Sequence, residues 1–211
     1  MTERTGEQQM PGTTPPAYLA HWVVKTARVR EMIEWYGHVF GAHVVHEGAK
    51  IAFLTWDEES HRLALIKLPP LMRFAFPLAK FRRKAYGLDH IAFGFDSLAG
   101  LLTKWEQLKE AGIEPVWAIN HGPTTSLYYE DPDGIRLEFQ VENFPTVQET
   151  AGFLSTQDFA DNPIGVNIDP GYLLEQLRGG VRESELLHRG AGTRPGTRQK
   201  ANRETINFRT L

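Results

Sequence analysis

The apolar positions in the first third of the chain change from strand-like to helix-like spacing and back again. Between 26 and 40, apolar side chains recur every three or four residues, which is the period of an amphipathic helix. Gly41 follows this stretch and is a natural helix end. Alternating or continuous apolar runs on either side indicate strands, so the predicted order is β-α-β-β-β. The strands are predicted at 18–25, 43–47, 50–56 and 61–67.

The same order of elements recurs farther along the chain. A second helix is predicted at 97–111, and the turn at 131–134, Asp-Pro-Asp-Gly, separates the last two strands of this second unit. His90 lies in the first strand of the second unit, as His21 does in the first, 69 positions earlier. This repetition predicts an internal duplication and an α+β fold of two tandem βαβββ modules. The strands of the second module are predicted at 88–93, 114–118, 124–130 and 135–141.

The pattern divides the chain into a central domain and less regular ends. The ends comprise a flexible arm, an extension with two short helices at 171–178 and 182–188, and a mobile tail rich in Gly, Arg and Thr. The apolar start of the linker between the modules, 69–77, is expected either to pack on the core or to form a wall over a site. The predicted boundaries are 1–16 for the arm, 17–143 for the domain (modules 17–68 and 88–143, linker 69–87), 144–188 for the extension and 189–211 for the tail.

The composition excludes several kinds of binding partner and metal site. The 211 residues are 41% hydrophobic and 23% charged with a formal charge of −3, which is typical of a globular protein and gives no electrostatic footprint for nucleic acid. The absence of cysteine excludes disulfides, thiolate metal sites and cysteine nucleophiles, so any metal must be bound by nitrogen and oxygen. The polar N-terminus and the lack of a long apolar run predict a cytoplasmic protein without a membrane partner.

Three residues stand out as candidate metal ligands. A single strand histidine is more often structural than functional, but a twofold relation between the modules would bring His21 and His90 together. Glu138 alternates with the apolar residues Leu137 and Phe139, so its carboxylate faces the side of the strand opposite to theirs. A buried carboxylate is costly unless it is paired or binds a metal. Pairing with a nearby Arg or Lys on an exposed sheet face is the structural alternative.

Two histidines and one carboxylate form the facial triad that suits Fe(II) and O2 chemistry. The position equivalent to Glu138 in the first module is Ala64, so the duplication supplies no fourth protein ligand. Coordination positions therefore remain open for a substrate that chelates through two oxygens and for O2. Ligand types alone leave both Fe(II) and Mn(II) open.

Residues 119–138, INHGPTTSLYYEDPDGIRLE, closely resemble the signature of the type I extradiol ring-cleavage dioxygenases, in the vicinal oxygen chelate superfamily. In that signature a His precedes an aliphatic residue and Tyr, then an acid-Pro-x-Gly turn, then the ligand Glu. Residues 61–65, HRLAL, resemble the stretch of that family in which a His acts as acid and base ahead of the second module. The resemblance covers about 18–143. Many members of the family carry four such modules, whereas this chain has only two, so it matches the one-domain branch.

The resemblance implies a half-open mixed β-barrel around a metal site, with the helices outside. It implies that His21, His90 and Glu138 bind Fe(II), and that His61, His121 and Tyr128 surround a catechol-type substrate. In the expected reaction O2 opens the ring next to the diol and gives an oxo-dienoate, in aromatic compound catabolism. His61 would act as base and acid, and Tyr128 and His121 would donate hydrogen bonds to the substrate oxygens. Free sheet edges also predict a homo-oligomer.

Two other functions are compatible with this fold. A glyoxalase-like metal isomerase is disfavoured because such sites usually use two carboxylates, and Ala64 takes the place of one of them. A metal-free protein that binds an aromatic or antibiotic ligand between the modules is the other alternative. Such a protein would show no dependence on metal and would consume no O2.

Overall fold

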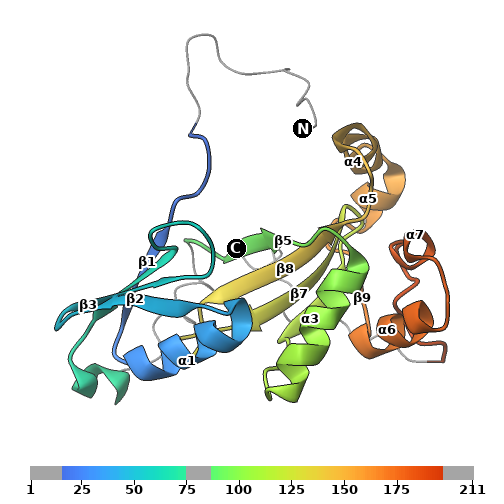
Figure 1. The fold of residues 1–211 in the computed structure, drawn as a ribbon. Coiled ribbons are helices and arrows are strands. Elements are labelled where there is room, and N and C mark those ends of the chain that lie inside the picture. The colour runs from blue at the N-terminus through green and yellow to red at the C-terminus, as the bar shows by residue number, and fades with distance from the viewer. Residues whose placement is uncertain (1–15, 75–86, 197–211) are drawn as a thin grey trace, which may run out of the picture.

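The computed structural model describes residues 16–74 and 87–196. Most of the predicted arm at 1–16, much of the linker at 69–87 and most of the tail at 189–211 lie outside the described residues. Within the described part, the chain is α+β, with two mixed sheets that each belong to one βαβββ module (Figure 1). This confirms the predicted α+β class and the two βαβββ modules.

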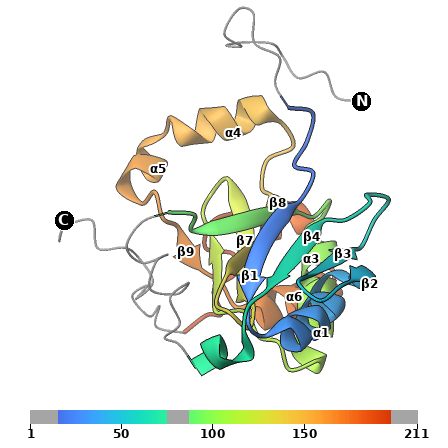
Figure 2. The ribbon, with the colours of Figure 1, turned by 90° about the vertical axis from the view of Figure 1, so that its left-hand side faces the viewer.

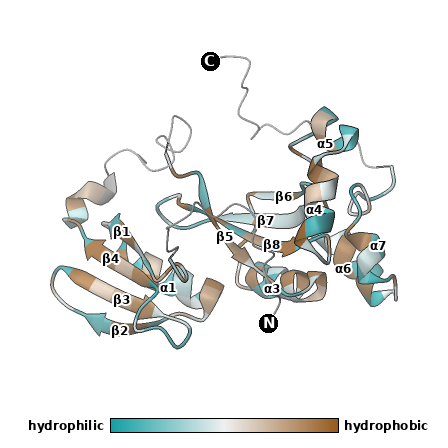
Figure 3. Cartoon of the chain, turned by 90° about the horizontal axis from the view of Figure 1, so that it is seen from above, coloured by the Kyte–Doolittle hydropathy of each residue, from teal (hydrophilic) through white to brown (hydrophobic). Residues whose placement is uncertain are grey.

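The first module is a four-stranded sheet with one helix. Helix α1 (Val29–Phe40) ends at Gly41, whose φ of 70° is favourable for glycine and which donates its backbone N–H to Gly37. The sheet has the order β1-β4-β3-β2, and β1 and β4 are parallel. Figure 3 shows β3 and β4 mostly in the hydrophobic colour and the edge strand β2 mostly in the hydrophilic one. The remaining elements are β1 (Trp22–Thr26), β2 (His43–Glu47), β3 (Ile51–Thr55), β4 (Leu63–Lys67) and the short 3-10 helix η1 (Pro70–Phe74).

The second module repeats this arrangement and adds one short strand from the extension. Its sheet has the order β5-β8-β7-β6-β9, with β5 and β8 parallel. Ser97 caps helix α3 (Leu98–Glu110) by accepting a hydrogen bond from Gly100. The predicted strand at 114–118 instead begins at Trp117, because Pro115 has no N–H to contribute to a ladder. The strands are β5 (His90–Gly94), β6 (Trp117–Asn120), β7 (Thr124–Glu130), β8 (Arg136–Glu142) and β9 (Val166–Asn167).

The strand registers relate the two modules position by position. In the parallel pair β1 and β4, Val23 lies opposite Ala64. In the parallel pair β5 and β8, Ala92 lies opposite Glu138. Ala64 therefore occupies in the first sheet the place that Glu138 occupies in the second, as the repeat predicted. The same registers place His21, just before β1, in the position equivalent to that of His90.

The two modules share one core. Phe40 at the end of α1 packs against Phe93 and Phe139 of the second sheet, with ring centroids 4.8 and 5.5 Å apart. Leu137 of β8 belongs to the apolar cluster of the first module, whereas Val39 of α1 belongs to that of the second. Helices α1 and α3 lie side by side beneath the two sheets, which leaves the opposite sheet faces uncovered by these helices (Figure 1).

The extension contains more helix than the sequence pattern predicted. Helices α6 (Pro170–Arg178) and α7 (Glu183–Leu186) agree with expectation, but α4 (Val147–Leu154) and α5 (Gln157–Asp161) were missed. A capping box between Thr146 and Glu149 begins α4, and this signal is present in the sequence. No residue of α4 or α5 is buried, so neither helix has the periodic apolar face from which a helix is predicted in a sequence. Figure 2 shows α4 standing apart from the two sheets.

The helices of the described residues are all too short or too polar to cross a membrane. The longest, α3, has 13 residues, whereas a spanning helix needs about 20.

A buried carboxyl group joins the modules at the turn between β7 and β8. Asp131 accepts hydrogen bonds from the backbone of Asp133 and Ile135 and, at 3.2 Å, from the hydroxyl of Tyr36 on α1. Burial raises the pKa of Asp131 to about 7, and the charge of Asp133 adds to this effect. An exposed aspartate has a pKa of about 3.9, so the ionised form of Asp131 opposes folding.

We therefore expect the free energy of unfolding to fall as pH rises from about 4 to about 7, and Asp131→Asn to lessen this fall. The amide oxygen can keep the two backbone hydrogen bonds, and the amide nitrogen can donate to the Tyr36 oxygen, both without the charge. The variant should therefore gain about 1–3 kcal/mol relative to the wild type between pH 4.5 and 7.5. Urea unfolding of the metal-free protein at the two pH values measures the difference. Asp161→Asn on α5 is the surface control. Equal pH dependence in the wild type and Asp131→Asn would contradict the assignment.

Candidate active site

The centre of the candidate site is a pair formed by His90 and Glu138. The Nε2 atom of His90 lies 2.8 Å from a carboxylate oxygen of Glu138. On the other side of the ring, Nδ1 lies 2.8 Å from the carboxylate of Asp89. Nε2 and the Glu138 oxygen are close enough to bind one ion together, and a carboxylate behind the other ring nitrogen is the usual support of a metal-binding histidine.

Glu138 is almost fully buried, at 4% exposure. Burial alone would raise its pKa, but hydrogen bonds from His90, Ser126 and Tyr128 hold the pKa of Glu138 below its ordinary value. The same contact with Glu138 raises the pKa of His90, and Asp89 adds to the shift. Each group therefore favours the charged form of the other.

Polar and aromatic side chains form a row across the second sheet beside this pair. Tyr128 lies opposite Glu138 in the register of β7 and β8, and its hydroxyl donates to the Glu138 carboxylate at 2.8 Å. Trp117, the next in the row on β6, stacks on Tyr128 with centroids 4.9 Å apart. His121 follows β6, and its Nε2 lies 3.0 Å from the Tyr128 hydroxyl. Strand register thus places Tyr128 beside Glu138, and the contact of His121 with the Tyr128 hydroxyl adds the third predicted residue.

The hydrogen bonds in this row compete for one hydrogen. The Nδ1 atom of His121 lies 2.5 Å from the carbonyl oxygen of Ile164, which only accepts, so Nδ1 carries the ring hydrogen. Burial lowers the pKa of His121, which favours the neutral ring and leaves Nε2 as an acceptor. The single hydroxyl hydrogen of Tyr128 then faces two acceptors, His121 and Glu138. The Tyr128 hydroxyl can therefore donate to only one of the two at a time.

The other two candidates lie on the first module. The rings of His21 and His61 are in contact, with centroids 4.5 Å apart, and His61 also contacts Phe53 at 4.6 Å. His21 is exposed and shares its side of the strand with the exposed Val23. Across 16–74 and 87–196, no three His, Asp or Glu side chains are grouped closely enough to hold a metal. The structure therefore brings His90 to Glu138, and His21 to His61.

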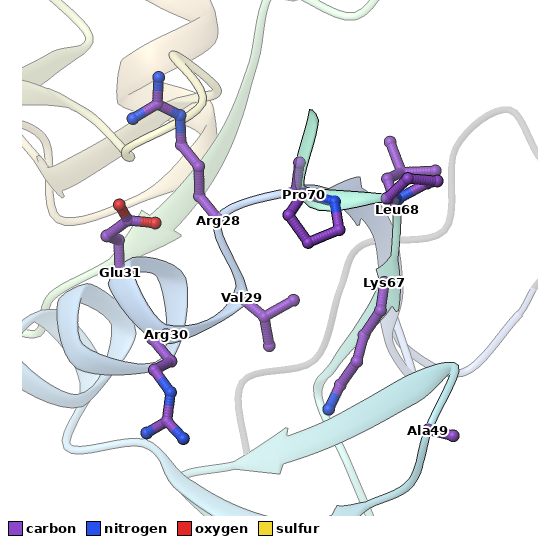
Figure 4. Close-up of a pocket in the computed structure, with 10 residues that line it drawn as sticks. Arg28, Val29, Arg30, Glu31, Ala49, Lys67, Leu68 and Pro70 are labelled. Carbon is purple, nitrogen blue, oxygen red and sulfur yellow. The ribbon is translucent and has the colours of Figure 1, made fainter. Parts of the chain in front are cut away.

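A cavity of about 680 Å³ lies elsewhere in the molecule, between the start of α1 and the end of β4 (Figure 4). None of its lining residues is a candidate site residue. Two of its three cations are already paired, Arg28 with Asp133 at 3.6 Å and Lys67 with Glu47 at 2.6 Å. Its lining residues are Ala27, Arg28, Val29, Arg30, Glu31, Ala49, Lys67, Leu68, Pro69 and Pro70.

Comparison with known proteins now identifies the family. The model of the glyoxalase/bleomycin resistance protein/dioxygenase superfamily matches residues 18–139. The chain belongs to this superfamily. It is 42% identical over 169 residues to biphenyl-2,3-diol 1,2-dioxygenase 2 of Rhodococcus globerulus, covering 80% of this chain and 85% of that protein. It is also 42% identical to biphenyl-2,3-diol 1,2-dioxygenase 3 of the same organism, covering 81% of this chain and 87% of that protein.

These relatives confirm the resemblance to ring-cleaving dioxygenases that the sequence motifs indicated. Among solved structures, the chain is similar to a lactoylglutathione lyase from Agrobacterium tumefaciens, with a TM-score of 0.46 and 19% identity over 61% of this chain and 96% of that one. Agreement at this level bears on neither chemistry nor substrate.

Three residues of this superfamily member were not predicted as part of the site. Asp89 supports His90, Ser126 hydrogen-bonds to Glu138, and Trp117 stacks on Tyr128. The position of Asp89 directly before a candidate ligand was a usable signal. The roles of Ser126 and Trp117 depend on which residues lie opposite them on neighbouring strands, which no local pattern specifies.

In the metal-free protein, we expect Glu138→Gln to lower the pKa of His90 relative to the wild type. The variant keeps the shape of the side chain but loses the charge that favours the imidazolium. NMR titration of the His90 ring measures the change, and Glu142→Gln, at the exposed end of the same strand, is the matched control. A His90 titration unchanged by Glu138→Gln would show that the pair does not control its protonation.

Proposed function

We propose that this chain is an Fe(II)-dependent extradiol dioxygenase that uses O2 to open a catechol-type ring next to its diol, giving an oxo-dienoate in aromatic compound catabolism. The observation that supports this most strongly is the buried Glu138 carboxylate, held against His90 and Tyr128 in a chain 42% identical to two biphenyl-2,3-diol 1,2-dioxygenases. Both names contain a diol on a two-ring substrate, so a bicyclic catechol is our first candidate.

His21, His90 and Glu138 would hold the metal, with Mn(II) as the alternative to Fe(II). The donor set fits, because two imidazole nitrogens and one carboxylate suit either ion. Asp89 directs the His90 ring so that Nε2 faces the carboxylate. The finer architecture is part of this proposal: the catalytic domain spans 17–143, and its two sheets form a half-open barrel around the metal, with the helices outside. In this arrangement His21 approaches the site from the first sheet.

When bound, the metal supplies a Lewis acid that lowers the pKa of the diol and a redox centre for O2. The remaining work falls to the side chains. His61 takes a proton from a diol hydroxyl and later returns it, since an imidazole can act as both base and acid. Tyr128 and His121 hold the substrate oxygens by hydrogen bonds.

Ala64 distinguishes this function from a glyoxalase-like isomerase. In register it lies where Glu138 lies in the other module, and at 2% exposure it leaves no second carboxylate there. We further propose that the chain forms a homo-oligomer, for which the exposed edge strand β2 is available.

The protein, loaded with Fe(II) without oxygen, should consume one O2 per diol and form a yellow ring-opened product. A panel of biphenyl-2,3-diol, naphthalene-1,2-diol and catechol, followed by an oxygen electrode and by absorbance, tests this. We expect the two-ring diols to have the higher kcat/KM. Protein without metal is the control, and it should be inactive. Absence of turnover with every diol in fully loaded protein would refute the proposed function.

Substitutions should separate the metal ligands from the acid–base residue. We expect His21→Ala, His90→Ala and Glu138→Ala to lose bound iron after desalting, whereas His61→Ala keeps iron and turns over about 100-fold more slowly. Metal analysis and kcat measure the two effects. His43→Ala, which removes an exposed histidine of β2, is the matched control and should change neither. Loss of iron from His61→Ala, with iron retained by His21→Ala, would reverse the assignment of these two histidines.

A further inference from the structure

We propose that Arg189, in the C-terminal extension, is a positioning residue for His121. The inference rests on the proposed function, because it concerns how His121 is held beside the substrate. It concerns a residue outside the two modules, in the stretch predicted as a mobile tail.

The guanidinium of Arg189 is enclosed between the extension and the His121 loop. Its side chain is 12% exposed, and Nη2 donates a hydrogen bond to the backbone carbonyl of His121. Nη1 pairs with the Asp158 carboxylate at 3.3 Å and donates to the Asp158 carbonyl at 3.2 Å. The group also lies over the ring of Phe153, 5.1 Å from the centroid. One arginine thus connects α4 and α5 to the backbone of a predicted substrate residue.

The backbone on both sides allows this close approach. Gly122 has a φ of 103°, and a Cβ there would collide with Phe153 and with the Arg189 guanidinium. Gly165 has a φ of 113°, and a Cβ there would collide with the backbone of Asn120 and His121. These two positions need glycine because the extension packs directly on the loop. The fit between loop and extension is therefore built into the backbone.

The extension determines the orientation of the His121 ring as well as its backbone. The Ile164 carbonyl accepts a hydrogen bond from Nδ1, which directs Nε2 toward Tyr128. Asn120, the preceding residue, donates to the carbonyl of Leu187, two residues before Arg189. Arg189 binds the backbone carbonyl of His121 itself. Without Arg189, the loop keeps its contacts with Ile164 and Leu187 but loses the one to the His121 backbone.

Other arginines of the extension serve as a contrast. Arg182 pairs with Glu185 of its own helix, three residues away, and is largely exposed. Arg178 pairs with Glu106 of α3 at the surface. Arg189 differs in that it combines burial, an aromatic contact and a bond to the His121 backbone. A purely structural role for Arg189 would predict a loss of stability without any specific effect on His121.

A double-mutant cycle in the Fe(II)-loaded protein separates these roles. We expect Arg189→Met to lower kcat/KM about 10- to 100-fold, because small displacements of a catalytic group are costly, and Arg189→Lys to recover part of this. In a His121→Ala background the same Arg189→Met change should have little further effect. Arg182→Met is the control and should match the wild type. Additive losses in the cycle would overturn the proposal.

NMR of the His121 ring in the metal-free protein gives an independent readout. Arg189→Met should shift the His121 ring signals, and Arg182→Met should not. If wild-type protein shows no turnover, the proposed function fails, and this NMR comparison alone decides the positioning role. Should Arg189→Met fail to fold, Asp158→Asn, which loosens the guanidinium from the exposed side, should give a smaller shift in the same direction. Unchanged His121 signals in the folded variants would overturn the proposal.

Discussion

The buried charge of Glu138 is the constraint on which the rest of the site depends. A carboxylate at this depth would cost several kcal/mol if it were unpaired, so the fold must supply partners for it. Glu138 has three such partners: His90 on the neighbouring parallel strand, and Tyr128 and Ser126 on the antiparallel one. Each partner in turn needs its own support, and this extends the polar network outward to Asp89 and to His121 beyond Tyr128.

This polar network is tolerated because the opposite face of the same strands is strongly apolar. Leu137 and Phe139 alternate with Glu138 and pack into the clusters that join the modules. Phe40 of α1 lies against both Phe93 and Phe139. The strand that carries the charge is therefore fixed by the shared core, and a shift of one residue in its register would move Glu138 into that core. Packing between the modules thereby determines where the carboxylate points.

Much of this organisation could be predicted from the sequence, because it depends on local periodicity and on the repeat. The alternation at 136–140 predicted the face of Glu138, and the duplication predicted that Ala64 is its counterpart. Helix α4 was not predicted because it has no buried face, although its capping box is present in the sequence. The roles of Ser126 and Trp117 in the site were not predicted for a different reason. Their contacts arise between strands, and the spacing of residues along one strand contains no information about the next.

The position of His21 depends on a longer-range relation than either motif. Its position in the repeat could be predicted, whereas its contact with His61 could not, since that contact joins the segments before β1 and β4. The two sheets carry different chemical groups on the sides that would face the substrate. One sheet carries the only carboxylate of the equivalent pair together with the Tyr128 row, and the other carries Ala64 and the two histidines. A diol bound between them would meet a fixed negative charge on one side and imidazole rings on the other. In the proposed site, the metal would then draw its ligands from both sheets, His21 from the first and His90 and Glu138 from the second.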